Sequence, residues 1–349
     1  MIAALDLGCS EFRSLRREDQ RLVARRIPAV YTVVDDLPTN RKALEQSHIP
    51  YSTASDALIV IGEAAIEVST LLSRPLVPLL LEGRLADQDP IGRQVCAWLI
   101  ELLLPAMPGE NNQCLMTLPR GEISAQGANG WTAEFLQHVV QLQGYQTITV
   151  SPTEALALAE LGENEFSGIC MCIGAESVHF AVMHQSHPLV ESRLLKGSRE
   201  IVDDFAHARR KYLWDHEGNS FINLPAIHQW LAQGDLCLVA HQSADDEWLG
   251  EAYAELLLSS MFSVKRKLQS CPDPLLKQPL PLVLSGGPVR LPGFTQLVEE
   301  ALKMSGLPVQ IDGIRVASFD PYSIARGLLI QATLNAGEGV EGMLVLEAA

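Results

Sequence analysis

The sequence has little positive charge for its length. Its 349 residues include 26 Lys and Arg against 42 Asp and Glu, which gives a formal net charge of −16 at pH 7. Proteins bind nucleic-acid phosphates and acidic lipid headgroups through clusters of basic side chains. The charge balance therefore argues against a nucleic-acid partner, and we expect any membrane contact to be indirect or weak.

Long hydrophobic runs are also missing. No apolar run reaches the roughly 18 residues needed to cross a bilayer, and the longest candidate, residues 99–107, is interrupted by Glu101 and Pro105. The N-terminus carries neither the basic segment nor the small-residue cleavage site of a secretory signal. The seven cysteines are odd in number and irregularly spaced, which makes a poor disulfide framework. These features favour a reduced, cytoplasmic protein.

The sequence lacks the common short motifs of metal sites and hydrolases, which are C-x-x-C, H-E-x-x-H and G-x-S-x-G. Cys170 and Cys172 form a C-x-C pair on a predicted strand, where a period of two residues places both side chains on one face. Because no second cluster offers further ligands, we interpret the pair as small buried hydrophobes rather than as a zinc site.

The residues that are present describe a globular chain of mixed architecture. Hydrophobic residues make up 47% and charged residues 19% of a length that allows two domains, each with its own core. Interleaved strands and helices predict an α/β protein with mixed sheets covered by helices. We predict a hairpin strand with a solvated face in residues 13–26 and irregular structure in residues 212–245. The predicted strands span residues 2–7, 57–61, 114–118, 148–150, 169–173, 179–183, 189–195, 280–284 and 309–311, and the predicted helices span residues 91–104, 131–143, 151–161, 198–211, 247–268, 295–304 and 321–333.

Three glycine-containing turns follow predicted strands, at residues 6–10, 172–177 and 284–294. Taken singly, each is more often a structural turn, because glycine adopts unusual backbone angles at little cost. Turns of this kind also expose backbone N–H groups that converge on anions. Two such turns on opposite sides of a cleft can hold a polyphosphate from both sides, and the first two turns each open a predicted hairpin. This recurrence suggests two similar domains that face a shared cleft.

The order of these segments resembles the five-part nucleotide signature of the actin/Hsp70/sugar-kinase superfamily, and the bacterial actin-like MreB family is the nearest match. The matching segments are DLG at 6–8, VSPTEALALAEL at 150–161, IGAES at 173–177, LVLSGGPVRLPGF at 282–294 and SIARGLL at 323–329. IGEAA at 61–65, RPLVPLLLEGRLAD at 74–87, KGSREIVD at 196–203 and RKY at 210–212 are also similar to MreB segments. The likeness covers roughly residues 2–212 and 250–333.

The resemblance implies a two-domain actin-like (ribonuclease H-like) α/β fold, with mixed sheets flanked by helices and a central cleft. Domain I would span residues 1–125 and be completed by a C-terminal helix at 320–335. Domain II would span residues 126–319, with a shortened small subdomain at about 212–247, and residues 336–349 would form a flexible tail. In the family this subdomain helps to build contacts along a filament. Because it would be shortened here, the resemblance implies polymerisation less directly than it implies the fold.

The resemblance also implies ATP with Mg²⁺ as the cofactor, bound weakly. Asp6 would hold the metal through water. The cofactor-binding residues by this likeness are Asp6, Gly8, Cys9, Ser10, Gly174, Ala175, Glu176, Ser177, Gly197, Glu200, Gly286, Gly287 and Pro288.

The second phosphate turn departs from the family pattern D-I-G-G-G-T. Cys172 stands where the family has an aspartate that helps to hold the metal, and Ala175, Glu176 and Ser177 replace the last Gly-Gly-Thr. A carboxylate at the phosphate contact repels a polyanion at short range.

The catalytic position departs as well. Ser151 stands where the family has the glutamate that orients the attacking water, and Glu154, three residues later, is the candidate substitute. The first turn retains Asp6 but adds Glu11, and residues 217–228 hold no counterpart of the segment that lines the family's adenine pocket. Hydrolysis needs a positioned water, a neutralising metal and backbone donors at the phosphates, so we predict weak or absent turnover of ATP.

Three functions remain open at this point. The first is an actin-like cytoskeletal or scaffold protein related to cell shape or division, which self-associates into filaments and joins protein partners of such a complex. The second is an active filament-forming ATPase of the same family. The third is a monomeric regulatory module that binds a partner protein. The degenerate turns favour the first and third, and the overall resemblance puts the first ahead.

Overall fold

Two five-stranded sheets of the same topology form the two halves of the molecule. The structure is a computed structural model and describes residues 1–18, 21–54, 56–109, 112–119, 130–215, 217–233, 236–271 and 274–336. The first sheet has the strand order β3-β2-β1-β8-β9 and the second the order β12-β11-β10-β15-β16. In each, the central strand is antiparallel to the hairpin strand that follows it and parallel to a strand from later in the chain. The predicted recurrence of two related halves is confirmed.

The first sheet is covered on both faces. Its strands are β1 (Ile2–Leu7), β2 (Glu11–Glu18), β3 (Arg21–Pro28), β8 (Gln113–Thr117) and β9 (Gln146–Thr149). Side chains alternate along a strand, and in β1 Ala3 and Leu5 pack with helices α3 (Pro90–Leu103) and α4 (Gly130–Leu142). Ala4 lies on the other face, in a cluster with residues of α10 (Ser323–Asn335). Burial on both faces explains why β1 is apolar apart from Asp6.

The second sheet repeats this arrangement. Its strands are β10 (Gly168–Ile173), β11 (Val178–His184), β12 (His187–Leu194), β15 (Pro279–Ser285) and β16 (Gln310–Val316). One face packs against α8 (Ala244–Gln269) and α9 (Phe294–Ser305), and the other against α5 (Pro152–Glu160). Cys170 and Cys172 are both buried on the α5 face, which confirms that they serve as small core hydrophobes.

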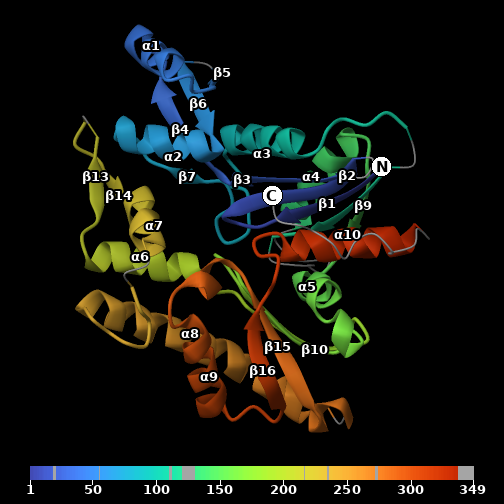
Figure 1. Cartoon of the computed structure of the whole chain (residues 1–349). Helices are drawn as coiled ribbons and strands as arrows, with labels where there is room; N and C mark the ends of the chain where they lie inside the picture. The colour runs from blue at the N-terminus through green and yellow to red at the C-terminus, as the bar shows by residue number, and fades with distance from the viewer. Residues whose placement is uncertain are drawn as a thin grey trace.

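Helices α5 and α10 pack against each other between the two sheets (Figure 1). A Cβ atom added at Gly327 would lie 1.7 Å from the carbonyl oxygen of Ala155. The two helix backbones can therefore approach this closely only because Gly327 has no side chain. This contact joins the two halves.

Each half also carries a smaller subdomain. The first contains the four-stranded sheet β5-β6-β4-β7. The second contains the hairpin β13-β14 with helices α6 and α7. Their elements are β4 (Val30–Asp35), α1 (Pro38–Gln46), β5 (Ser52–Ala54), β6 (Ala57–Ile61), α2 (Gly62–Leu71), β7 (Val77–Pro78), α6 (Ser198–Ala208), β13 (Tyr212–Trp214), β14 (Ser220–Ile222) and α7 (Leu224–Ala232). Short 3-10 turns occupy Gly162–Asn164, Pro274–Lys277 and Gly287–Arg290.

Two local predictions are only partly correct. The described part of residues 212–245 is not irregular throughout, because it contains β13, β14, α7 and the start of α8; the strands are only three residues long, too short for a periodic pattern. The strand β2 does not present a solvated basic face either. Arg16 is only 4% exposed and donates from Nη1 to the carbonyl of Leu103, 3.0 Å away. The exposed face belongs to its partner β3 instead.

Some predictions concern residues beyond those that the structure describes. The boundary placed at residue 125 and nearly all of the tail at 336–349 fall there. The division into 1–125 and 126–319 therefore stays a prediction. Among the residues described, no helix is long and apolar enough to cross a membrane.

Candidate functional site

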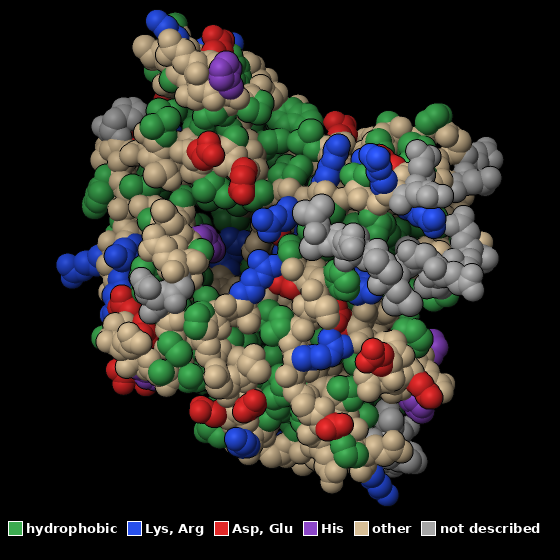
Figure 2. Space-filling model, in the orientation of Figure 1, with side chains coloured by type: hydrophobic (Ala, Val, Ile, Leu, Met, Phe, Trp, Pro, Cys, Tyr) green, Lys and Arg blue, Asp and Glu red, His purple; other side chains and the backbone are tan. Residues whose placement is uncertain are grey.

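A cavity of about 180 Å³ lies where β1 and β10 end and α5 begins. All three glycine turns predicted from the sequence line it, with the start of α5 between them. Figure 2 shows the molecule hollowed near its centre, with Lys and Arg side chains around the hollow. The cofactor-binding candidates that line the cavity are Asp6, Gly8, Cys9, Ser10, Gly174, Ala175, Glu176, Ser177, Gly286, Gly287 and Pro288.

Asp6 forms the floor on the side of the first sheet. Its Oδ1 accepts a hydrogen bond from Thr117 Oγ1 at 2.7 Å, and its Oδ2 accepts from Arg13 Nη1 at 3.1 Å. The hairpin register places Arg13 directly opposite Asp6, and Thr117 lies on the parallel strand β8. Both carboxylate oxygens of Asp6 are therefore engaged within the protein.

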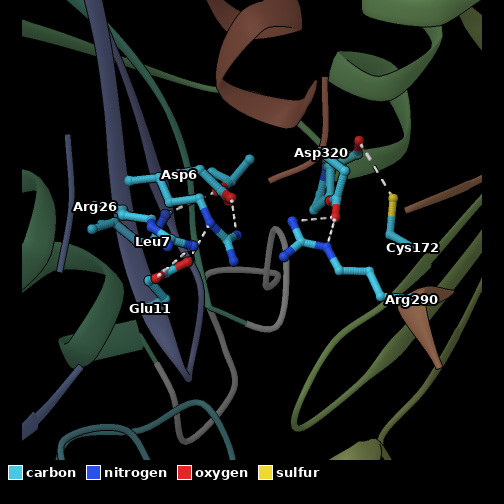
Figure 3. A network of polar contacts seen from close by, with 10 residues as sticks. Asp6, Leu7, Glu11, Arg26, Cys172, Arg290 and Asp320 are labelled. Carbon is cyan, nitrogen blue, oxygen red and sulfur yellow. Dashed lines mark hydrogen bonds and ion pairs between the residues drawn. The ribbon is translucent and has the colours of Figure 1, made fainter. Parts of the chain in front are cut away.

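Arg13 also binds a second carboxylate. Its Nε donates to Glu11 Oε2 at 2.7 Å, and Arg26 Nη1 lies 3.8 Å from the other oxygen of Glu11. Burial lowers the Arg13 pKa, but Asp6 and Glu11 raise it by more, so that the net shift is upward and the guanidinium stays charged. Figure 3 shows this cluster at the end of the first hairpin.

The second turn is tight and internally hydrogen-bonded. Gly174 N donates to Ser177 O at 2.9 Å, and Ser177 Oγ lies 3.1 Å from His179 Nε2. Burial lowers the pKa of His179 to about 4, with a smaller contribution from Arg193. His179 is thus a neutral imidazole at pH 7.

Glu176, the carboxylate predicted to repel phosphate, is paired with Arg199 of α6. Arg199 Nε donates to Glu176 Oε1, and Arg199 Nη2 donates to the carbonyl of Cys9 at 3.2 Å. The pair forms because α6 begins directly on the second turn, where Ser198 N binds Gly174 O at 3.0 Å. A Cβ at Gly197 would lie 2.2 Å from the carbonyl of Ala175. Gly197 therefore serves the docking of α6.

The third turn packs on the second sheet. Gly286 has φ +120°, and a Cβ there would lie 1.9 Å from the carbonyl of Ile173. Only glycine fits such a position. Nearby, Arg290 Nε donates to Asp320 Oδ2 at 2.7 Å, and Figure 3 shows this pair across the cavity from Asp6.

The residues present do not fit a divalent-metal site. The Cys172 thiol donates to the Pro152 carbonyl at 3.8 Å, and burial raises the pKa of that thiol well above its usual value. It is therefore protonated, whereas metal binding requires a thiolate. Mg²⁺ prefers carboxylates and water, and both oxygens of Asp6 are already engaged. No group of three or more His, Cys, Asp or Glu in the described part of the chain is placed to hold a metal ion.

Four candidate residues are absent from the lining of this cavity. Ser151 Oγ donates to Glu191 Oε1 at 2.9 Å, and Glu154 accepts from the Ser151 backbone N–H at 3.3 Å in a capping box at the start of α5. The exposed side chain of Glu200 pairs with that of Lys196, and Gly197 is the residue that caps the start of α6. Glu154, the candidate substitute for the catalytic glutamate, thus binds its own helix terminus.

Sequence reasoning missed the two arginines, Arg13 and Arg199, that occupy the site. One signal for Arg13 was available, since it lies in the hairpin strand directly after the first turn. Arg199 lies 23 residues after Glu176, and only the docking of α6 brings the two together.

These features define an actin-like protein: two sheets of matching topology, a paired α5–α10 contact and turns that meet in a central cleft. The family model described as Volactin matches residues 1–332. The chain therefore belongs to the Volactin family.

Solved actin-like structures share the fold. The MamK double helical filament is 16% identical, with a TM-score of 0.68 over 95% of this chain and 98% of that one. MreB5 of Spiroplasma citri bound to ADP is 15% identical, with a TM-score of 0.65 over 97% of this chain and 98% of that one. No curated protein sequence matches. The predicted fold class and the resemblance to MreB are confirmed.

Proposed function

We propose that this chain is an actin-like cytoskeletal or scaffold protein that assembles with copies of itself and does not depend on ATP hydrolysis. The observation that carries the proposal is that the acidic side chains of the cleft are already paired within the chain. Its phosphate-side carboxylates, Asp6 and Glu176, are bound to arginines of the same chain. The fold supplies the scaffold, while the charges that would hold a metal are engaged elsewhere.

Two further features support weak nucleotide binding and weak hydrolysis. The cavity, at about 180 Å³, is smaller than the roughly 300–1,000 Å³ typical of small-molecule sites. The water-orienting glutamate of the family is replaced by Ser151, and Glu154 caps its own helix. ATP with Mg²⁺ would meet backbone donors in the turns but no metal ligands beyond Asp6.

Assembly is supported by likeness of fold. The similar solved structures include a double helical filament and an ADP-bound MreB5. We further propose a cytoplasmic role in cell shape or division, with protein partners from such a complex. The shortened small subdomain at about 212–247 and the degenerate site also suit a monomeric regulatory module, which is the second candidate function.

The test combines pelleting, negative-stain electron microscopy and phosphate release, each with and without ATP and Mg²⁺. We expect polymers in both conditions and phosphate release no higher than that of the Asp6→Asn variant, which removes the retained carboxylate. Release that Asp6→Asn abolishes would establish an active ATPase and overturn the proposal. A monomer in every condition would establish the regulatory module instead.

A further inference from the structure

Arg199 links the two halves of the molecule across the cleft. It belongs to α6 in the second half, and its Nη2 donates to the carbonyl of Cys9 in the β1–β2 turn of the first half, 190 positions away in sequence. The same guanidinium binds Glu176 through Nε. One side chain thus joins the two turns that face each other.

The position of Arg199 is fixed by its own helix. Its backbone N–H donates to the carbonyl of Ala175 at 2.9 Å, one residue before Glu176. The missing side chain at Gly197 permits this contact. Arg199 and Glu176 are only 15% and 13% exposed, so their interaction is screened less than a surface ion pair.

We infer that the hydrogen bonds from Arg199 to Glu176 and to the Cys9 carbonyl hold this cleft closed without a nucleotide, and we call this pair of contacts the clasp. In this role the Arg199 guanidinium connects the first and second turns directly, as a phosphate group bound with its metal ion would do. The inference rests on the proposed function in placing any nucleotide phosphates at these turns. It adds that the closed arrangement is the resting state of the chain and that nucleotide competes with the clasp.

The competition follows from charge. A phosphate that takes the Nε donor of Arg199 displaces Glu176, and the released carboxylate then lies beside a polyanion in a partly buried site. The same holds for Arg13, which would have to leave Asp6. Each arginine that a nucleotide recruits therefore exposes a carboxylate that repels it.

Hydrogen exchange of backbone amides tests the closure. The N–H groups of Gly174, Ser198 and Arg199 are bonded within the second turn and the α6 junction. In the wild type we expect these amides to be protected and unchanged by millimolar ATP with Mg²⁺. In Arg199→Gln we expect about tenfold faster exchange there and in the first turn, since a charge-assisted hydrogen bond is lost. Arg210→Gln, at the exposed end of the same segment, should exchange as the wild type does.

Equilibrium binding of labelled ATP tests the competition. Glu176→Gln removes the competing charge and keeps Arg199, so we expect affinity to rise about tenfold, while Arg199→Gln should not gain affinity. Strong protection of the wild-type turns by ATP, or unchanged affinity in Glu176→Gln, would overturn the clasp. Neither result bears on the proposed function, which phosphate release and pelleting test separately. Measured hydrolysis would overturn the proposed function but would not change the exchange expected for Arg199→Gln.

Discussion

Replacing Gly327 with alanine should separate the two helices that join the halves. The added Cβ would lie 1.7 Å from the Ala155 carbonyl oxygen and 2.4 Å from its carbonyl carbon. Ordinary contacts of a Cβ atom begin at 3.4 Å, so relieving the 1.7 Å contact requires α10 and α5 to separate by about 1.7 Å. That shift loosens the cluster that contains Ala4, Leu115 and Leu328.

The net cost is about 2 kcal/mol. Overpacking a tight contact costs about 1–3 kcal/mol and occasionally more, and a backbone-to-backbone clash belongs at the upper end. Alanine is about 1 kcal/mol more favourable than glycine inside a helix, which offsets part of this cost. For a chain of 349 residues, the loss corresponds to a decrease in Tm of about 3 °C.

Urea unfolding followed by circular dichroism, together with a thermal scan, measures this change. Gly162→Ala is the matched control, because its Cβ would meet only Phe166 Cε1 at 3.8 Å, an ordinary contact just after the same helix α5. We expect the control to change stability by less than about 0.5 kcal/mol. If Gly327→Ala is as stable as Gly162→Ala, the close helix approach does not hold the halves together as argued.

Two other predictions concern stability. Glu160 accepts from Arg315 Nη1 at 2.6 Å and from Ser318 N and Oγ at 3.0 Å with its carboxylate 2% exposed. Glu160→Ala should cost about 3 kcal/mol in urea unfolding, whereas the exposed Glu163→Ala should cost almost nothing; equal values would contradict the buried network. His179 has a pKa of about 4 when folded against about 6.5 when unfolded. The unfolded chain therefore binds the extra proton, and about 3 kcal/mol present above pH 6.5 is lost as the pH falls to 4. His179→Gln should show a smaller loss between pH 7 and pH 4.5, and parallel profiles would refute the assignment.

The local sequence determined the turns and the central strands. The run 2–7 is apolar except for Asp6, because β1 is buried on both faces. DLG, IGAES and SGG mark strand ends that need glycine or a tight hairpin, as Gly286 demonstrates with φ +120°. The order of these segments was sufficient to predict the fold, because each pattern is local and depends on nearest neighbours.

Such local patterns could not predict the short strands or the buried charged side chains. The hairpin β13–β14 has strands of three residues, which carry no periodic signal. The sequence pattern predicts that the arginines of β2 face solvent, yet Arg16 is buried, because the carbonyl of Leu103, 87 residues away, accepts a hydrogen bond from it. Burial of a charged side chain depends on a distant partner, which one strand cannot reveal.

The sequence by itself determined that this chain has the actin-like fold, and its resemblance to MreB predicted that the cleft departs from the family pattern at Cys172, Ala175 and Glu176 in the second turn and at Ser151 before α5. Tertiary structure alone decided which partners the acidic side chains of the cleft have. Glu176 was expected to face an incoming phosphate and repel it, but it faces Arg199, because Gly197 lets α6 dock on the second turn. Asp6 was expected to hold a metal, but it holds Arg13 across the hairpin. Ion pairs depend on where side chains meet in space, and that meeting is fixed by the packing of helices and strands far apart in the chain.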